Sequence, residues 1–508
     1  MIAKSVNFLM RQGVFLKSIP LGTVEKSNDG SSKKWPLQLK VWPPNILLEE
    51  FGFRKFAELP VSLPNSEIRT TEPRIIEQPN PIMHKVVIID GCRTPFLRSG
   101  TDYMDLMSYQ LGAYAIKGLL TQTGLDPKWV DKVVMGNVIS NIQTPNVARE
   151  AALTAGIPST TPCHTVSQAC ISANRAIVDG CLEIMAGQAD IVIAGGVDHT
   201  SDTPIQFPRK MRKKLFKAQR LKTIGDNLSF LTSLRPTDFV PERPQVAEYT
   251  TNRVMGEDCD IMAARFQVGR EEQDAFAVRS HQLAAKAFEQ GYLPKEMTEV
   301  SLPPDFTPIS RDNGVRGDST IESVSKLRPA FDKKFGTLTA ANSSFLTDGA
   351  AACLIMSEEK AKELGFTPKV EVVDFVFTGQ RLEDELLLGP TYAVSKLLKR
   401  QNMELKDIDV IEFHEAFAGQ ILSNLKALAS DEFAQQNLGR DKAVGTIDMS
   451  KFNLWGGSLS IGHPFGATGA RIATTTANRL QKENGKYGLL AACAAGAHGH
   501  AMLLKRWA

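Results

Sequence analysis

Cys170 is the residue best placed for chemistry, because it lies where a short β-prone segment gives way to a helical pattern. The surrounding segment, Thr165–Ala186, reads TVSQACISANRAIVDGCLEIMA, with apolar residues at helical spacing after the cysteine. The first N–H groups of a helix have no intrahelical partner, and the helix dipole adds partial positive charge there. We therefore expect the Cys170 thiol to ionise readily and act as a nucleophile, with Ser167 or Ser172 supporting the turn. The alternative is a buried structural thiol.

Three further polar residues come at the ends of strand-like runs in the C-terminal part of the chain. His414 lies in the segment HEAF, His463 in GHPFGATG and Cys493 in CAAGAHG. Taken alone, each residue has an ordinary structural interpretation: His414 as a helix cap, His463 as part of a turn and Cys493 as a thiol that fills the core. Together with Cys170 they supply a nucleophile, a histidine to activate it, a thiol for proton transfer and several donors, which suits acyl transfer through a thioester. HEAF lacks the second histidine of a zinc HExxH motif, and no CxxC or Cys/His cluster is present, so we predict no metal site.

The elements that must position these residues follow an order that occurs twice. Strands are expected at residues 84–90, 132–138, 161–166, 191–197 and 349–357, and again at 370–377, 409–413, 488–492 and 501–504, with residues 452–459 leading to a helix over 468–480. Apolar runs separated by helical segments are typical of parallel strands covered on both faces. We predict two similar α/β halves, with the site between them at the C-terminal ends of the strands.

Length and composition allow a soluble protein of two or three domains. The 508 residues are 43% apolar and 23% charged, with a net charge of only +3, and no apolar run approaches the roughly 20 residues that span a bilayer. Seven cysteines without dense spacing favour a reducing compartment over a disulfide framework. We expect an extension at 1–83, the first half at 84–202 and 337–364, an inserted loop domain at 203–336, and the second half at 365–508.

The N-terminal residues have the composition of a targeting peptide. Residues 1–24 contain Lys4, Arg11 and Lys17, no acidic residue, and apolar side chains between the basic ones. This pattern resembles a mitochondrial transit peptide rather than a secretory signal. A disordered tail without a targeting role is the alternative.

A basic segment opens the insertion. Residues 209–222 carry eight Lys or Arg residues and no acid, and apolar residues recur at three- and four-residue steps through residue 231. The spacing predicts one amphipathic helix over residues 209–234. Such a helix suits contact with a membrane surface or an acidic ligand, whereas the alternative is a solvated helix that covers a core.

From about residue 84 to its end, the chain resembles the thiolases. The resemblance is carried by SQACISANRA, AANSSFLTDGAAA, HEAFAGQ, GGSLSIGHPFGATGAR and AACAAGAHGH. It implies a thiolase-like α/β fold, in which two βαβαβαββ halves stack as a five-layered α/β/α/β/α core with a large loop domain inserted in the first half. It also implies an acyltransferase, an acetyl-CoA C-acyltransferase.

The resemblance assigns roles to the two cysteines and one histidine. Cys170 would attack the 3-keto carbon of a 3-ketoacyl-CoA, activated by His463. Cys493 would protonate the acetyl-CoA carbanion that leaves, and would then deprotonate the incoming CoA. CoA enters as a substrate, so no cofactor is implied.

The resemblance also assigns donors to the substrate oxygens. The backbone N–H groups of Cys170 and Ala495 would hold one thioester oxygen. His463 and His414 would polarise the other, although His414 stands where most thiolases have asparagine and could instead only order its turn. Ser344 matches a serine that contacts the pantetheine of CoA.

HEAF in place of NEAF, together with the basic insertion, is similar to the β subunits of mitochondrial trifunctional complexes. This implies a 3-ketoacyl-CoA thiolase of fatty-acid β-oxidation on the matrix side of the inner membrane, peripherally attached and without nucleic-acid partners. The implied assembly is a β–β dimer with an α subunit that carries hydratase and dehydrogenase activities. A biosynthetic acetoacetyl-CoA thiolase, a ketoacyl synthase with a Cys-His-His site and a silent scaffold subunit are the alternatives.

Overall fold

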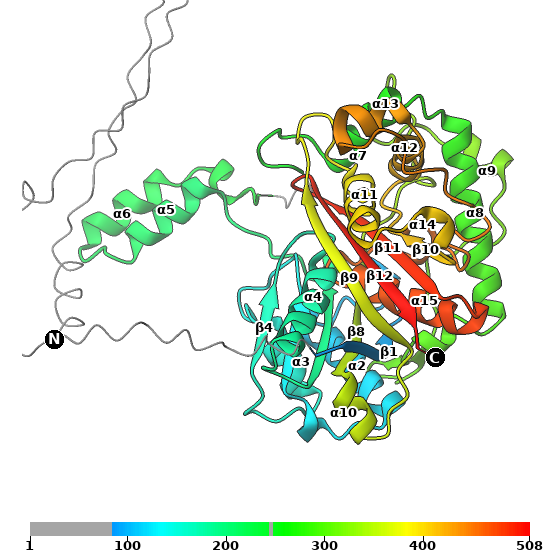
Figure 1. The fold of residues 1–508 in the computed structure, drawn as a ribbon. Coiled ribbons are helices and arrows are strands. Elements are labelled where there is room, and N and C mark those ends of the chain that lie inside the picture. The colour runs from blue at the N-terminus through cyan, green and yellow to red at the C-terminus, as the bar shows by residue number, and fades with distance from the viewer. Residues whose placement is uncertain (1–83, 243–246, 508) are drawn as a thin grey trace, which may run out of the picture. The chain divides into compact units, whose positions relative to one another are not determined.

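A ten-stranded mixed sheet forms the centre of the fold (Figure 1). The computed structural model describes residues 84–242 and 247–507, so the expected targeting peptide and extension lie outside the described residues. Along the sheet the strand order is β10-β11-β12-β9-β1-β8-β5-β3-β4, and the short strand β2 also pairs with β8.

The first half supplies strands β4-β3-β5-β8-β1 in their spatial order. Its elements are β1 (Val86–Arg93), β2 (Leu97–Arg98), α2 (Ser108–Thr123), β3 (Lys132–Gly136), α3 (Val147–Thr154), β4 (Cys163–Val166), α4 (Ser172–Met185), β5 (Ile191–Asp198), β8 (Thr347–Ser357) and α10 (Glu358–Glu363). Every residue of β8 is buried, because β1 and β5 flank it and helices cover it.

The second half supplies β10-β11-β12-β9. Its elements are β9 (Val370–Gly379), α11 (Gly389–Gln401), β10 (Val410–Phe413), α12 (Ala418–Leu428), α13 (Asp431–Phe433), α14 (Ser458–Ile461), α15 (Thr468–Glu483), β11 (Tyr487–Ala494) and β12 (His498–Arg506). Residues 452–459 lead toward a helix, as expected, with one bridge from Ile411 to Phe452 before Ser458 begins α14.

Helices and strands stack in five layers. Helix α15 packs against α4 and against strands of both halves, and α4 packs against strands of the first half, so these two helices form the central layer. Helices α2 and α3 cover the other face of the first half, and α11 and α12 cover that of the second. The halves are also joined directly, since β1 pairs with β9 at Val87–Glu371 and Ile88–Val370.

The expectation of parallel strands holds only where a helix connects neighbours. Pairs β3–β4, β3–β5 and β10–β11 are parallel. Strand β8 is antiparallel to β1 and β5, and β12 is antiparallel to β11 and β9. The turn between β11 and β12 is too short for a parallel crossover, which needs a dozen or more residues.

The insertion divides into a hairpin and a helical cover. Its elements are α5 (Arg209–Ala218), α6 (Ile224–Ser233), α7 (Met255–Arg265), α8 (Arg270–Glu289), β6 (Val300–Ser301), β7 (Pro308–Ile309) and α9 (Ile321–Ser325). Helices α7 and α8 pack on α12, and α8 also packs on α14. Among the described residues, no helix combines the length and apolar composition needed to cross a bilayer.

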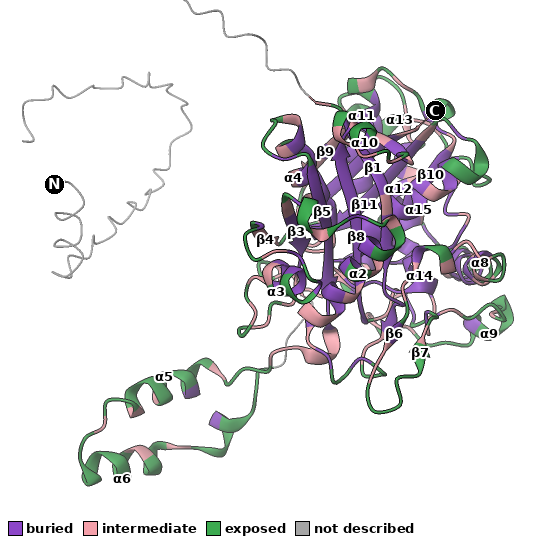
Figure 2. Cartoon of the chain, turned by 90° about the horizontal axis from the view of Figure 1, so that it is seen from below, coloured by how far each residue is buried: buried purple, intermediate pink, exposed green. Residues whose placement is uncertain are grey.

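The single amphipathic helix expected over residues 209–234 is wrong, because the segment forms two helices. Thr223 caps α6 by accepting a hydrogen bond from the Asp226 N–H, and the Asp226 carboxylate accepts one from the Thr223 N–H. This capping box starts a new helix and ends the old one. Most of both helices is solvent-exposed (Figure 2).

Candidate active site

Cys170 lies on a tight turn between β4 and α4. The helix begins at Ser172, so the cysteine stands just before the helix rather than within it. Ser172 Oγ accepts a hydrogen bond from the Gln168 N–H (2.8 Å) and donates to the Ala169 carbonyl (2.7 Å). Ala169 has a left-handed φ of 45°, which an alanine adopts only under constraint from its surroundings. Ser172 therefore supports the turn that presents the thiol, as the sequence predicted.

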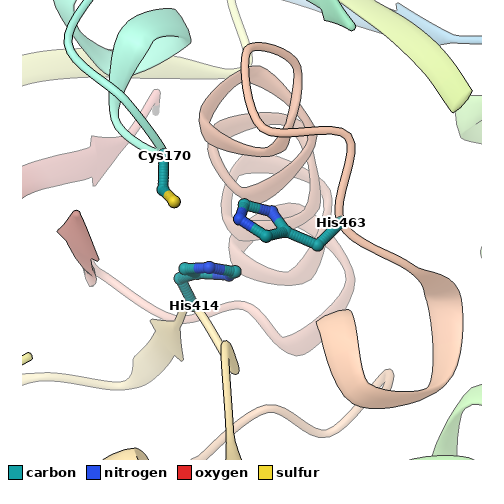
Figure 3. Close-up of side chains that lie close together, drawn as sticks. All are labelled: Cys170, His414 and His463. Carbon is teal, nitrogen blue, oxygen red and sulfur yellow. The ribbon is translucent and has the colours of Figure 1, made fainter. Parts of the chain in front are cut away.

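Cys170, His414 and His463 come together from three separate segments (Figure 3). The Cys170 sulfur and one ring nitrogen of each histidine all lie within 4.8 Å of one another. The two imidazole centroids are 4.0 Å apart, and both histidines are buried. This is the arrangement needed for a nucleophile with an adjacent base and donor. Such spacing could also suit a metal ion, so the absence of a metal site stays a prediction.

The proton of His463 is placed by Thr468. The Thr468 hydroxyl donates to the Pro464 carbonyl (2.9 Å) and lies 2.6 Å from His463 Nδ1. A hydroxyl has one proton, so Thr468 must accept from Nδ1–H of a neutral imidazole. His463 Nε2 then carries a lone pair, and it has no hydrogen-bond partner among the described residues. His463 is therefore a base with its free nitrogen in the cluster.

Burial decides the protonation states at rest. It raises the pKa of Cys170 to about 12, opposed by the backbone N–H groups of Ala495 and Cys170 and reinforced by the Asp198 carboxylate. The expectation that Cys170 ionises readily is thus wrong for the resting protein. The residue is only half-buried, but desolvation by the surrounding protein outweighs the effect of the helix start. Burial, followed by the charge of Arg471, lowers the pKa of His463 to about 3.

His414 follows directly after β10 and is fully buried. Its pKa is well below the usual value because of burial, with smaller effects from His463 and Arg471, so the ring is neutral. Nδ1 lies 3.0 Å from Ser458 Oγ, whereas Nε2 has no hydrogen-bond partner among the described residues. Because Nδ1 faces Ser458, the neutral ring can offer a proton to a substrate oxygen only from Nε2.

Cys493 and Ala495 lie beside this cluster at the end of β11. Cys493 is on the strand itself, one residue before its end, and its pKa is raised by burial and by the nearby Cys170. The Ala495 backbone N–H points at the Cys170 sulfur, where it favours negative charge. Ser344 is half-buried and donates its N–H to the Ala416 carbonyl (2.9 Å), which places it beside the HEAF segment.

A cavity of about 560 Å³ opens onto the nucleophile. Its lining is mostly apolar and includes Cys170, Ala495, Leu346 and Phe465. Gln206 and Glu242, which form a bridge at the base of the α5–α6 hairpin, also line it. Ser344 is not among the lining residues. The volume is within the range of small-molecule pockets, and its apolar surface suits an acyl chain.

Two buried or half-buried carboxylates tie loops together around the cavity. Asp198, at the end of β5, accepts hydrogen bonds from Ile139 N–H (2.7 Å) and from Gly466 N–H. It thus connects the first half to the loop that carries His463. Glu248 of the insertion accepts from Gly496 N–H (2.8 Å), next to Ala495. Neither residue is identifiable from a motif, although Asp198 does follow a buried strand.

Residues 86–359 match the family model of the thiolase N-terminal domain, and residues 366–506 match that of the thiolase C-terminal domain. The chain belongs to the thiolase family. It is 50% identical over 440 residues to the human protein named trifunctional enzyme subunit beta, mitochondrial, covering 87% of this chain and 92% of the relative. It is 46% identical over 425 residues to a probable 3-ketoacyl-CoA thiolase of Caenorhabditis elegans, covering 84% and 95%.

Solved thiolase structures share the fold. Human mitochondrial 3-ketoacyl-CoA thiolase superposes with a TM-score of 0.71 at 30% identity, over 84% of this chain and 100% of that one. An acetyl-CoA acetyltransferase of Bacillus anthracis superposes with a TM-score of 0.72, also at 30% identity and with the same coverage. The thiolase family, the fold class and the acyltransferase class expected from the sequence are confirmed.

Proposed function

We propose that this thiolase cleaves 3-ketoacyl-CoA with CoA to give acetyl-CoA and a shortened acyl-CoA, within mitochondrial fatty-acid β-oxidation. The observation that carries the proposal is the Cys170–His414–His463 cluster at an apolar cavity, with Cys493 adjacent. Relatives named as mitochondrial trifunctional β subunits and as 3-ketoacyl-CoA thiolases support this direction over a biosynthetic one.

The first half-reaction begins with a proton transfer from the Cys170 thiol to His463 Nε2. The sulfur attacks the 3-keto carbon, and the C2–C3 bond then breaks, leaving the shortened acyl group on Cys170. The electron pair passes to acetyl-CoA as an enolate, whose oxygen accepts hydrogen bonds from His414 and from the newly protonated His463. Cys493 gives its proton to C2, which releases acetyl-CoA.

The second half-reaction returns every proton. The Cys493 thiolate takes the proton of the incoming CoA thiol, and the CoA sulfur attacks the acyl group on Cys170. The Ala495 and Cys170 N–H groups stabilise the oxyanion, the C–S bond to Cys170 breaks, and the Cys170 sulfur recovers its proton from His463. Ser344, half-exposed beside the HEAF segment, is proposed to contact the pantetheine of CoA.

A thiolysis assay with purified protein tests this function. CoA-dependent loss of 3-ketoacyl-CoA is expected, with mass spectrometry showing the acyl group on the Cys170 peptide when CoA is withheld. Cys170→Ala should abolish both. We also propose a preference for long acyl chains, and comparing short with long 3-ketoacyl-CoA tests it. A protein that condenses acetyl-CoA but does not cleave longer 3-ketoacyl-CoA would be a biosynthetic thiolase instead.

We propose a mitochondrial α-subunit partner because of the 50% identity to a trifunctional β subunit. Tagged protein purified from its native mitochondria should carry enoyl-CoA hydratase and 3-hydroxyacyl-CoA dehydrogenase activities in the same complex. N-terminal sequencing of this protein tests whether the basic N-terminus is removed on import. Thiolase activity that elutes alone, or an intact Met1, would contradict the respective proposal.

The α5–α6 hairpin is proposed to contact an anionic membrane surface. Phe216, Ile224, Leu228 and Leu231 are 69%, 89%, 63% and 61% exposed, next to the lysines and arginines of α5. Apolar side chains that insert at an interface and basic residues near anionic lipid reinforce each other, each basic residue contributing about 1 kcal/mol. Lys214 is not available, because its Nζ lies 2.6 Å from the Asp238 carboxylate.

Liposome flotation tests the hairpin. Changing Lys213, Lys217 and Arg220 to Glu should reduce binding to cardiolipin vesicles at low salt. The matched control changes three exposed lysines outside the hairpin, Lys128, Lys396 and Lys442, to Glu and should bind as the wild type does. Equal flotation of both variants would contradict the membrane role.

A β–β dimer is proposed across β4. Among the described residues this strand ends the sheet and pairs only with β3, so its outer edge offers backbone groups to a second copy. Light scattering should give twice the mass of one chain for the isolated protein. A monomeric mass would contradict the proposal.

A further inference from the structure

Ser458 stands between His414 and a buried arginine. Its hydroxyl oxygen lies 3.0 Å from His414 Nδ1 and accepts a hydrogen bond from Arg471 Nη2 at 3.0 Å. All three residues are at most 1% exposed. Ser458 is the first residue of the short helix α14 and Arg471 lies in the first turn of the long helix α15, so both side chains come from buried helix starts.

Proton counting fixes the direction of the Ser458 hydrogen bond. An arginine can only donate, so the Arg471 bond occupies a lone pair of Ser458 Oγ. Among the described residues, the hydroxyl proton has one available acceptor, which is His414 Nδ1. If Nδ1 carried the proton, both neighbours would point donors at the same oxygen and the buried Ser458 hydroxyl would have no acceptor. The arrangement that satisfies every group makes His414 Nδ1 an acceptor.

Arg471 is suited to hold Ser458 in this role. Within the described part of the chain, no carboxylate forms an ion pair with its guanidinium, and its Nε and Nη1 have no hydrogen-bond partner. Glu412, Glu296 and Glu415 balance its charge from a greater distance. A fixed, permanently charged donor cannot be turned into an acceptor, so the Ser458 hydroxyl proton is directed away from Arg471 and toward His414.

We propose that Ser458, held by Arg471, is a positioning residue that fixes His414 as the Nε2–H tautomer. His463 is held in the opposite tautomer by Thr468, with Nε2 unprotonated. Two histidines whose rings lie 4.0 Å apart thereby present different groups to the substrate, one donor and one base. The assignment of the tautomer depends on hydrogen bonding alone, whereas its effect on catalysis depends on the thiolysis proposed above.

Nitrogen NMR of the free protein, labelled with ¹⁵N-histidine, tests the tautomer without substrate. The sequence contains eight histidines, so the signals of residue 414 are assigned by their loss in His414→Asn. The wild type should show a protonated Nε2 and an unprotonated Nδ1 at residue 414. Ser458→Ala should populate the other tautomer. A protonated Nδ1 in the wild type, or an unchanged tautomer in Ser458→Ala, would overturn the proposal even if thiolysis occurs.

Kinetics test the consequence. Ser458→Ala should lower kcat about tenfold or more, up to the roughly 10²–10³ expected for losing one oxyanion donor, with little change in KM. The loss should shrink to about threefold or less when residue 414 is already asparagine, because coupled residues are not additive. Ser458→Thr, which keeps the hydroxyl, should recover most of kcat. Ser460→Ala, which removes a neighbouring buried hydroxyl that does not contact either histidine, is the matched control.

Two outcomes would contradict the positioning role. Equal losses from Ser458→Ala in the wild-type and His414→Asn backgrounds would show that the hydroxyl acts on the loop rather than through His414. A loss of kcat in Ser460→Ala as large as that in Ser458→Ala would also show an effect on the loop rather than an effect through His414. A wild type without thiolysis would refute the proposed function, and the NMR result would still decide the tautomer.

Discussion

At pH 7 about one Cys170 thiol in 10⁵ should be ionised, because burial raises its pKa to about 12. An unperturbed cysteine is ionised to a few per cent at this pH. The thiolate is therefore formed only when His463 takes the proton during attack, and not as a resting ion pair. The neutral state of His463 agrees with this, since burial lowers its pKa to about 3.

The pH dependence of alkylation measures this directly. Iodoacetamide reacts with the thiolate, so the rate at the Cys170 peptide should rise about tenfold per pH unit up to at least pH 9, without a plateau. Cys170→Ala corrects for labelling elsewhere. His463→Ala should lose turnover but keep the same alkylation profile. A plateau below pH 8, or a profile that shifts in His463→Ala, would show a thiolate at rest and refute the reasoning.

Three further predictions concern neighbouring groups. Cys493→Ala should lower kcat by about 10²–10⁴, the usual contribution of a general acid–base, while Cys170 is still alkylated; near-normal turnover would show that Cys493 has another role. His414→Ala should lower kcat by about 10²–10³ and His414→Asn by less, because the amide still donates; wild-type kcat in His414→Ala at an equal melting temperature would exclude the oxyanion role. Dialysis against EDTA should leave thiolysis unchanged, since the cluster supplies nucleophile, base and donor by itself; a loss that zinc restores would reveal a metal site.

The sequence predicts the positions of His414 and Cys493 because each lies at the end of a strand, whereas His463 follows the short helix α14 and not the strand-like run expected before it. His414 comes directly after β10, and Cys493 lies at the end of β11. Parallel strands β10 and β11 bring their ends to one edge, so these residues must lie close together. The same periodicity predicts nearly all strands of both halves. It does not predict the short helix α14 (Ser458–Ile461), which comes just before His463.

The protonation states could not be predicted from the sequence, because they depend on packing. A cysteine before a helix predicts a low pKa, and only the folded structure shows that desolvation of the Cys170 thiol outweighs that effect. Likewise, Thr468 and Ser458 are ordinary helix-start residues in the sequence. Their hydroxyls acquire a role only because the fold aims one at each active-site histidine.

The position of β8 dictates the order in which the protein can fold during synthesis. This strand lies between β5 and β1, yet residues 199–346 separate it from β5 along the chain. Until the ribosome, or an import channel, has released that long segment, β1 and β5 have unpaired edges and the first half has no continuous sheet. Exposed edges pair readily with other chains, and nascent chains emerge at only about 5–20 residues per second. The vulnerable interval therefore lasts several seconds or more, and a chaperone that shields strand edges would be needed then.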